Sequence, residues 1–404
     1  MERLIIKLDS YIFLLLCVLL FVIPISNAMI EVSACSAILL WAIKRLVMKR
    51  MNKTSFFPFT PIAYSLYAFI FVVILSSVFS SNVALSFRHF SRKTLEYFAI
   101  FLLFVDTINN KKRAKIVINV LFASFLLISV DVLVQYFSGF EFLRNRIPVA
   151  GRIAGPYEYP DGFGNYLVSF LPLLLVFRPK LKSYIFLRYA LLLFFLFFLI
   201  INSTKGAWIA FVTVFVFLGF YLKEKRFIAI PIILMLLFMI SPQKTKTLTI
   251  SQFRLAQASI LQRIDLWKTS WNMFIDKPII GQGLGTYMSN FKKYQDEKER
   301  SVGEQGIWYA HNSYLQMLAE NGILGLFSFL AVIFSAFIFA FKSLSISSDK
   351  FFRMSIMGFI AGLFGYSVQI FFDSTFYSLS NAVIFWSILG IVVAMSKINN
   401  SIQA

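Results

Sequence analysis

Histidine and cysteine are scarce in this chain, with two of each among 404 residues. Cys17 and Cys35 both fall in apolar stretches, so we expect free thiols rather than a disulfide framework. Two histidines cannot build a histidine-rich metal site, and no Asp-x-Asp pair occurs in the sequence. We therefore expect neither a bound metal ion nor any other cofactor.

Acidic residues are also few, and the common nucleotide-binding motifs are missing. There is no phosphate-binding loop of the P-loop type and no dinucleotide fingerprint, so we do not expect direct use of nucleotide energy. Lys and Arg total 39, against 19 Asp and Glu. The basic residues stand in short clusters between apolar runs, a pattern that orients membrane segments rather than one that binds nucleic acid.

Long apolar runs dominate what is present. Hydrophobic residues make up 59% of the chain and include 49 Phe, more than a soluble protein of this length could bury. We therefore expect an all-α polytopic membrane protein with about twelve transmembrane helices, although several runs are shorter than the roughly 20 residues of a crossing helix. The runs fall at about 11–30, 31–43, 60–80, 93–108, 116–137, 163–177, 185–202, 206–222, 227–241, 322–342, 354–372 and 380–396.

The basic clusters predict an orientation, because Lys and Arg are enriched in short cytoplasmic loops. With the N-terminus inside, the short loops rich in Lys and Arg fall on the inner side. Both termini are then cytoplasmic, and the one long polar loop lies outside. The expected organisation is transmembrane helices 1–9 over residues 1–241, the loop over 242–310, and transmembrane helices 10–12 over 311–404.

The long loop should contain helices of its own. From Thr249 to Ile275 apolar residues recur at helical spacing, which predicts an amphipathic helix lying on the membrane or on the bundle. Pro278 should end this helix, and Gly281 to Gly285 should form a flexible turn. Ser289 to Arg300 is typical of a charged, solvated helix.

After the loop, a helix from Asn312 to Phe341 would be longer than one crossing. Asn321 and Gly322 form a natural helix end. We therefore expect a short interfacial helix from His311 to Asn321, a break, and then the membrane span. Gly322 and Gly325 share a helical face and would permit close packing, as small-residue pairs in membrane helices commonly do.

The outer face carries the candidate chemistry. His311 follows the loop beside an amide, and imidazole is the side chain best suited to exchange a proton near neutral pH. Arg263 on the loop helix can bind phosphate through its planar fork, and Lys205 is a cation where a helix begins. Simpler roles remain open: helix capping for the histidine, and headgroup contact or topology for the cations. Asp131 lies inside a span, where hydrogen bonding to Ser124, Ser129 or a neighbouring helix explains it as well as function does.

Four motifs resemble those of bacterial O-antigen ligases. His311-Asn312, nine residues and Gly322-Ile-Leu-Gly325 resemble the H-[NSQ]-x9-G-x-x-G signature of that family. The stretch 263–291 resembles the family's R-x-x-x-W…P-x-x-G-x-G-x-G…F segment, STKGAW at 203–208 resembles its S-R-G-A-W element, and 154–167 resembles its outer loop before the sixth span. The order and spacing of the motifs are more specific than any one of them.

The resemblance implies a membrane-embedded glycosyltransferase of the bacterial inner membrane with a periplasmic active site. It would move a glycan from undecaprenyl pyrophosphate to a hydroxyl of lipid A–core, with neither metal nor nucleotide sugar. His311 matches the family's catalytic histidine and Arg263 one of its two functional arginines, while the other arginine falls on Lys205. The supporting residues would be Asn312, Arg152, Glu320, Gly322 and Gly325.

The resemblance leaves the acceptor open. O-antigen polymerases and O-linked protein oligosaccharyltransferases share the same fold and motifs, and a transporter of lipid-linked glycans is a further alternative. A transporter would favour internal repeats and charged residues at the midplane. The sequence has no evident repeat, and Asp131 is its one deep acidic residue, so glycan transfer is the better interpretation.

Overall fold

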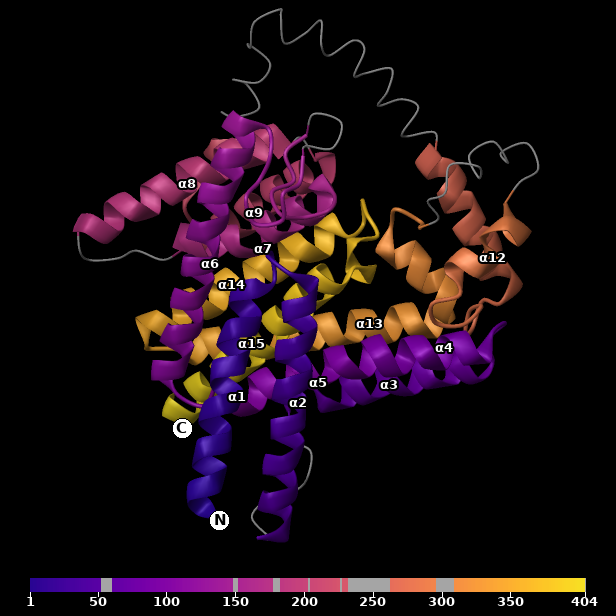
Figure 1. The fold of residues 1–404 in the computed structure, drawn as a ribbon, viewed down its shortest axis with the longest axis horizontal. Coiled ribbons are helices and arrows are strands. Elements are labelled where there is room, and N and C mark those ends of the chain that lie inside the picture. Colours follow the sequence, from indigo (N-terminus) through magenta and orange to yellow (C-terminus); the bar gives the residue numbers. More distant parts are fainter. Residues whose placement is uncertain are drawn as a thin grey trace, which may run out of the picture.

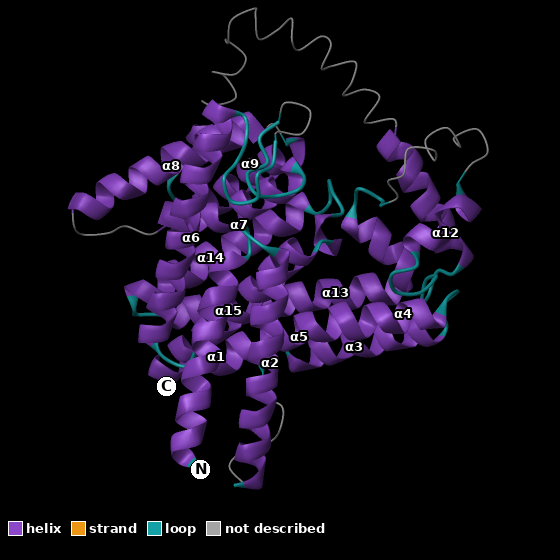
Figure 2. Cartoon of the chain, viewed as in Figure 1, coloured by secondary structure: helices purple, strands orange, loops and turns teal. Residues whose placement is uncertain are grey.

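The computed structural model describes residues 1–51, 60–147, 152–176, 182–202, 204–225, 227–231, 262–295 and 309–403. Throughout these residues the chain folds into helices joined by loops, with no β-strand (Figure 2). The helices are α1 (Glu2–Val22), α2 (Asn27–Arg50), α3 (Ala63–Val78), α4 (Val83–His89), the π-helical turn η1 (Phe90–Thr94), α5 (Leu95–Thr107), α6 (Lys111–Ser138), α7 (Pro160–Val176), α8 (Lys182–Asn202), α9 (Lys205–Leu222), a helix over 262–276, α12 (Tyr287–Tyr294), α13 (Ser313–Ile346), α14 (Lys350–Gln369), the 3-10 turn η3 (Thr375–Tyr377) and α15 (Leu379–Gln403).

Within the described ranges, six helices are long and apolar enough to cross a membrane: α1, α6, α9, α13, α14 and α15. The chain is therefore an all-helical polytopic membrane protein, as its composition predicts. Further expected spans fall on α2, α3, α5, α7 and α8, which are helical but shorter or more polar. The expected span at 227–241 lies largely outside the described residues, so the total of twelve stays a prediction.

The core is built on α15 and α14. The α15 helix is almost entirely enclosed and packs against α5, α13 and α14, while α14 packs against α7 and α9 (Figure 1). Gly362 brings α14 onto α7, because a Cβ added there would lie 2.0 Å from the carbonyl oxygen of Ser169. Close backbone approach at small residues is a usual way for membrane helices to associate, since lipid provides no hydrophobic drive between them.

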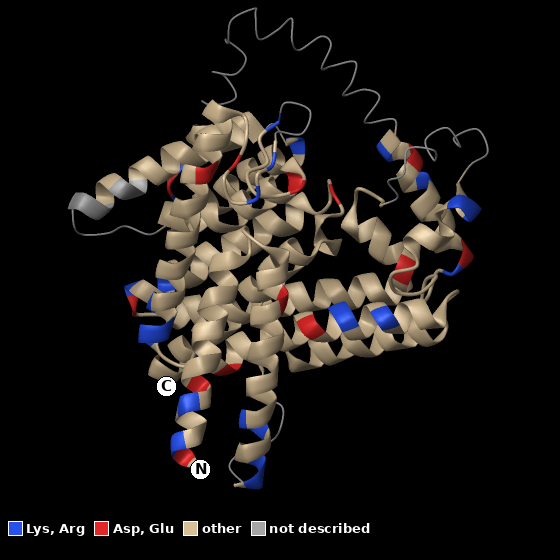
Figure 3. Ribbon diagram, in the orientation of Figure 1, with Lys and Arg blue, Asp and Glu red and all other residues tan. Residues whose placement is uncertain are grey.

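Both chain ends lie at one end of the bundle, where opposite charges meet (Figures 1 and 3). Lys44 of α2 lies 2.5 Å from Asp9 of α1 and 3.0 Å from Asp106 of α5. Arg113 of α6 reaches Asp9 at 2.5 Å, and Arg45 also pairs with Asp106. Such partly buried charges are stable only when paired, so these contacts fix the relative positions of four helices at this end.

The described part of the long loop, residues 262–295, packs as a small unit beside the bundle. The predicted amphipathic helix is present over 262–276 and ends before Pro278, whereas residues 249–261 lie outside the described part of the chain. Leu266 and Met273 of this helix share a separate apolar cluster with Tyr287 and Phe291 of α12. Of the predicted charged helix at 289–300, the described portion belongs to α12.

The predicted break in α13 is confirmed. Gly322 has φ 65° and ψ −169° inside the helix, so a short helix from Ser313 precedes the main span. The turn at 278–283 satisfies the backbone groups that the break frees: Gln282 N donates to Ala319 O at 2.9 Å, and Ile323 N donates to Pro278 O at 2.9 Å. Buried backbone groups need such partners, and a chain segment far away in sequence supplies them.

The expectation of a flexible glycine turn at Gly281 to Gly285 is wrong. Gly281, Gly283 and Gly285 all have positive φ, and a Cβ on Gly281 would lie 2.4 Å from the backbone of Glu320. The glycines are needed because the turn lies directly on the break in α13, where no side chain fits. The turn is therefore a packed structural element.

Gly322→Ala should destabilise the fold strongly. The positive φ alone costs about 1–2 kcal/mol for a residue with a Cβ, and that Cβ would also lie 2.3 Å from the carbonyl oxygen of Ile279. Gly139→Ala is the matched control, since Gly139 has φ 82° but open space around it. Thermal unfolding in detergent should show a clearly larger loss for Gly322→Ala. Equal losses would mean that the contact with the 278–283 turn is unimportant.

Candidate functional site

A cavity of about 500 Å³ lies at the end of the bundle away from the chain termini. Its wall comes from the α1–α2 turn, the loop that precedes α7, the residues before α13, and the segment from the end of α14 to the start of α15. Among its lining residues are Arg144, Tyr157, Glu158, Asp161, Tyr309, His311, Asp373, Thr375, Tyr377 and Asn381. The cavity thus combines charged groups with aromatic rings.

His311 is held at the start of α13 in a strained conformation. Its φ is 47°, which is uncommon for a residue with a side chain and often marks a functional position. Asn312 follows as the N-cap, accepting hydrogen bonds from the backbone N–H of Tyr314 and Leu315 at 3.0 Å each. Ser313 donates from its backbone N to Ile370 O at 2.9 Å and from its hydroxyl to Asp373 O at 2.9 Å. The segment at the end of α14 therefore fixes the backbone that carries His311.

Asp373 faces this histidine. Its Oδ1 lies 3.5 Å from Nδ1 of His311 and accepts a hydrogen bond from Ser374 N at 2.6 Å. A carboxylate at this distance from one ring nitrogen favours the tautomer in which that nitrogen carries the proton. The other nitrogen is then free to act as an acceptor. Asp373 could not be selected from sequence, because nothing in its local pattern links it to His311.

Asp161, in the first turn of α7 and ahead of its apolar stretch, connects this pair to the arginines. Its carboxyl interacts electrostatically with the Asp373 carboxyl and with Arg152 and Arg263. Burial raises the pKa of Asp161, the neighbouring Asp373 carboxylate raises it further, and the two arginines oppose the rise. Asp161 was missed from sequence, although it stands in the 154–167 motif.

Arg152 is immobilised where α9 begins. Its guanidinium lies 3.7 Å from Asp161 and donates to Asn202 O at 3.1 Å and to Thr204 Oγ1 at 2.8 Å. Asn202 in turn donates to the backbone on both sides of this loop, at Ile153 O and Pro160 O. The arginine expected only in a supporting role thus lies beside Asp161, with its fork fixed.

Lys205 does not line the cavity, and neither do Arg152 and Arg263, which interact with Asp161 on its wall. Lys205 is the exposed first residue of α9. Its neighbours nevertheless contact the site: Thr204 binds Arg152, and a Cβ on Gly206 would lie 3.0 Å from Phe372. The helix N-terminus adds partial positive charge at this edge, so an anion bound here would meet both charges.

Arg263 approaches Asp161 from the loop helix. It is half-buried, and its helix rests on the end of α14 through Trp267, whose ring lies 6.2 Å from that of Phe371. Arg263 of the loop helix, Arg152 of the loop before α7, and His311 just before α13 therefore lie around the carboxylates of Asp161 and Asp373. Three of the residues selected from sequence, His311, Arg263 and Arg152, belong to this cluster.

Arg144 is a further cation that the sequence reading did not select. It lines the cavity, and its Nε donates to Ile25 O. Its loop is tied down by two carboxylates: Glu141 accepts from Arg144 N at 2.9 Å, and Asp131 accepts from Phe142 N at 3.0 Å. Asp131 therefore anchors the loop after its own helix, and Ser124 and Ser129, the partners expected from sequence, bond elsewhere.

Glu320 lies outside the His311 cavity. It is almost fully buried, and its carboxylate accepts from Gly285 N at 3.0 Å and from Tyr287 N at 3.2 Å, where α12 begins. A carboxylate is stabilising at a helix N-terminus. Glu320, Gly322 and Gly325 thus hold the loop and the break in α13 together, while Glu304, another candidate base, lies outside the described residues.

Comparison with known proteins bears on the same region. No curated protein matches the chain. Residues 189–330 match the family model described as O-antigen ligase. That range contains Lys205, Arg263 and His311, together with the break in α13. The match confirms the resemblance found in the motifs: residues 189–330 of this membrane protein are similar to O-antigen ligases.

Proposed function

We propose that the protein is an O-antigen ligase that transfers a glycan from undecaprenyl pyrophosphate to a hydroxyl of lipid A–core at the periplasmic face of the inner membrane. The observation that carries the proposal is a cluster in which His311, Asp373 and Asp161 line the cavity, while Arg152 and Arg263 interact with Asp161. A base and several cations within one site match the two requirements of this transfer: a hydroxyl must lose its proton, and a diphosphate must leave.

His311 is the proposed base. With Asp373 at its Nδ1, the other ring nitrogen accepts the proton of the acceptor hydroxyl as that oxygen attacks the anomeric carbon of the first donor sugar. A new glycosidic bond forms, and the bond from the anomeric carbon to the diphosphate oxygen breaks. The bonding electrons leave with undecaprenyl pyrophosphate, and the proton stays on His311 until water removes it.

The arginines are proposed to stabilise the leaving diphosphate. Guanidinium groups fit phosphate oxygens with paired hydrogen bonds, and fixed charges stabilise developing negative charge most where water is excluded. In the structure Asp161 lies 3.7 Å from Arg152, interacts electrostatically with Arg263 and has a raised pKa. Protonation of Asp161 would release the arginines to the diphosphate, so the carboxyl can act as a placeholder until the donor binds.

A deletion strain tests the proposal against its nearest alternative. A ligase mutant should retain lipid-linked polymer of normal length but attach none of it to lipid A–core. Loss of polymer length would instead identify a polymerase. Reconstitution of the full-length protein with lipid-linked glycan and lipid A–core should then give the joined product, and absence of product from a folded preparation would contradict the proposal.

Reporter fusions should place Lys111 and Lys350 in the cytoplasm and Arg146, Lys268 and Asp373 in the periplasm. The reason is the enrichment of Lys and Arg in the short loops on one side, which is the side where both termini lie. A cytoplasmic signal at Lys268 or Asp373 would put the site on the wrong side for a periplasmic donor.

Lys205→Ala should lower transfer by about tenfold or more, the effect of about 1.4 kcal/mol of lost charge stabilisation. Lys205→Arg should retain activity, because it keeps the charge and supplies the planar fork. Lys225→Ala, an exposed lysine beyond the other end of α9, is the matched control. Transfer rates in the reconstituted assay decide the matter. Full activity of Lys205→Ala would assign diphosphate binding to the arginines alone.

A further inference from the structure

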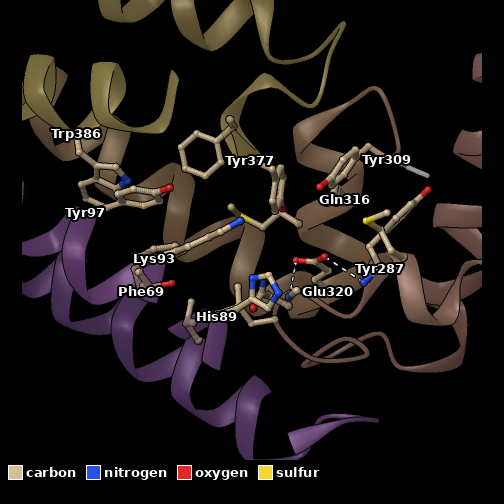
Figure 4. A pocket seen from close by; sticks show the side chains of 18 residues that line it. Phe69, His89, Lys93, Tyr97, Tyr287, Tyr309, Gln316, Glu320, Tyr377 and Trp386 are labelled. Carbon is tan, nitrogen blue, oxygen red and sulfur yellow. Dashed lines mark hydrogen bonds between the residues drawn. The ribbon is translucent and has the colours of Figure 1, made fainter. Parts of the chain in front are cut away.

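A second, smaller pocket of about 130 Å³ adjoins the His311 cavity (Figure 4). It lies between the helical stretch of α4, η1 and α5, the short first part of α13, the η3 turn and the residues around Gly285. Met288, Tyr309 and Tyr377 line both this pocket and the larger cavity. A substrate could therefore extend from one into the other without leaving the protein.

The pocket wall carries polar atoms that no other part of the described chain satisfies. The side chains concerned come from α5, α13, η3 and α15 and are nearly all fully enclosed. The atoms are Tyr97 Oη, Gln316 Oε1, Asn321 Oδ1, Tyr377 Oη and Trp386 Nε1. Buried polar groups are almost always paired, and each exception calls for an explanation. Here three can donate hydrogen bonds and two can accept them.

Charged groups complete the wall. Lys93 and Glu320 both line the pocket, with the lysine side chain extending between Tyr377 and the carboxylate (Figure 4). Lys93 belongs to the π-helical turn η1, which interrupts an otherwise α-helical stretch. The extra residue of a π-bulge turns side chains to a new face, and such bulges are frequent at functional sites. His89, just before this turn, also lines the pocket.

The combination of aromatic faces with both donors and acceptors points to a polyhydroxylated ring. We propose that the pocket binds one sugar ring of a substrate glycan, while the neighbouring ring reacts at His311. The hydroxyl groups of a sugar donate and accept, so one ring can pair with tyrosine and indole donors as well as amide oxygens. A polyprenyl chain would leave all five atoms unpaired and is excluded on that ground.

The proposal rests on the proposed function for its choice of substrate, and the ring could belong to the donor glycan or to the acceptor core. Kinetics with the full-length reconstituted protein separate the two. Tyr97→Phe and Tyr377→Phe each remove one unpaired hydroxyl and keep the ring. The double variant should raise KM about tenfold, in keeping with the loss of two hydrogen bonds, for the substrate whose ring occupies the pocket, with kcat nearly unchanged.

Tyr314→Phe is the matched control. Its hydroxyl donates to Ser367 O at 2.7 Å and lines neither cavity. It should lower the thermal unfolding midpoint and leave both KM values as they are. Tyr97→Phe and Tyr377→Phe should show the reverse, because their hydroxyls have no protein partner to lose. A purely structural role for the pocket tyrosines would lower the midpoint without a selective rise in KM.

A binding measurement works without turnover. Saturation-transfer NMR with free glucose, galactose and N-acetylglucosamine, on the protein in detergent, should give a signal for at least one sugar that falls several-fold in the double variant. The NMR measurement still tests sugar binding in the pocket if the wild type transfers no glycan. Absence of transfer would contradict the proposed function but not the sugar-binding pocket. The inference would be overturned if the wild type and the double variant had the same KM for each substrate and gave the same NMR signals. The pocket would then hold water only.

Discussion

Replacing His311 with alanine should lower the rate of glycan transfer about 10²–10⁴-fold, the usual contribution of a positioned acid–base group. The protein should still fold, because the contacts that fix the start of α13 come from Asn312 and Ser313. Initial rates with lipid-linked glycan and lipid A–core measure the effect. A folded alanine variant with near wild-type turnover would remove the base from the mechanism.

His311→Gln separates two roles of the imidazole. A glutamine can donate a hydrogen bond to a phosphate but cannot accept the hydroxyl proton. If His311 is the base, Gln should therefore be about as inactive as Ala. A general base acts only in its unprotonated form, so any pH dependence that the wild-type rate owes to this base should be absent from the residual rate of the Gln variant.

Asp161 requires a control in the same experiment. Burial raises its pKa, and the nearby Asp373 carboxylate adds to the rise, so it takes up a proton at a higher pH than an ordinary carboxyl. In the proposed mechanism, protonation of Asp161 frees the arginines and would favour donor binding at lower pH. Protonation of His311 has the opposite effect on the rate, because a protonated imidazole cannot act as the base. Comparing the pH dependence of the transfer rate in Asp161→Asn and in the wild type shows how much of it is due to Asp161. Near-wild-type turnover by His311→Gln, with a flat pH profile, would leave the histidine as a positioning donor.

Arg263→Ala should reduce transfer by about 10²–10³-fold or to background, as loss of a fixed group that stabilises developing charge typically does. Arg263 interacts electrostatically with Asp161, so its removal also unbalances the carboxylates beside His311. Arg152→Ala should have a comparable effect, since its guanidinium lies 3.7 Å from Asp161.

Two variants make this result specific. Arg263→Lys keeps the charge but loses the planar fork, and should recover only part of the activity. Lys268→Ala lies on the same helix and removes an exposed cation that approaches Asp265 at 3.6 Å; it should retain activity. Measured rates, with protein levels checked in the membrane, decide the outcome. Full activity of both Arg263→Ala and Arg152→Ala would leave the diphosphate without its proposed cations.

The sequence by itself determined the features that depend on local chemistry. The apolar runs predicted a helical membrane protein, because a span must satisfy its own backbone hydrogen bonds and face lipid. The helix end at Asn321-Gly322 was also readable, since a helix end depends on one or two adjacent residues. His311 and Arg263 were identified from the sequence because few residue types can exchange a proton near neutral pH or bind a phosphate through paired hydrogen bonds.

Only the tertiary structure decided which distant residues meet. Asp161 lies in the first turn of α7 and Asp373 in the segment between α14 and η3, and no periodicity reveals that their carboxyls interact beside His311. The same holds for Arg152, which becomes fixed only through Asn202 and Thr204. The glycine turn looked flexible in isolation, yet it is held by the backbone of α13. The local sequence pattern indicates which conformations a segment can adopt. The contacts between segments depend on how the whole bundle packs.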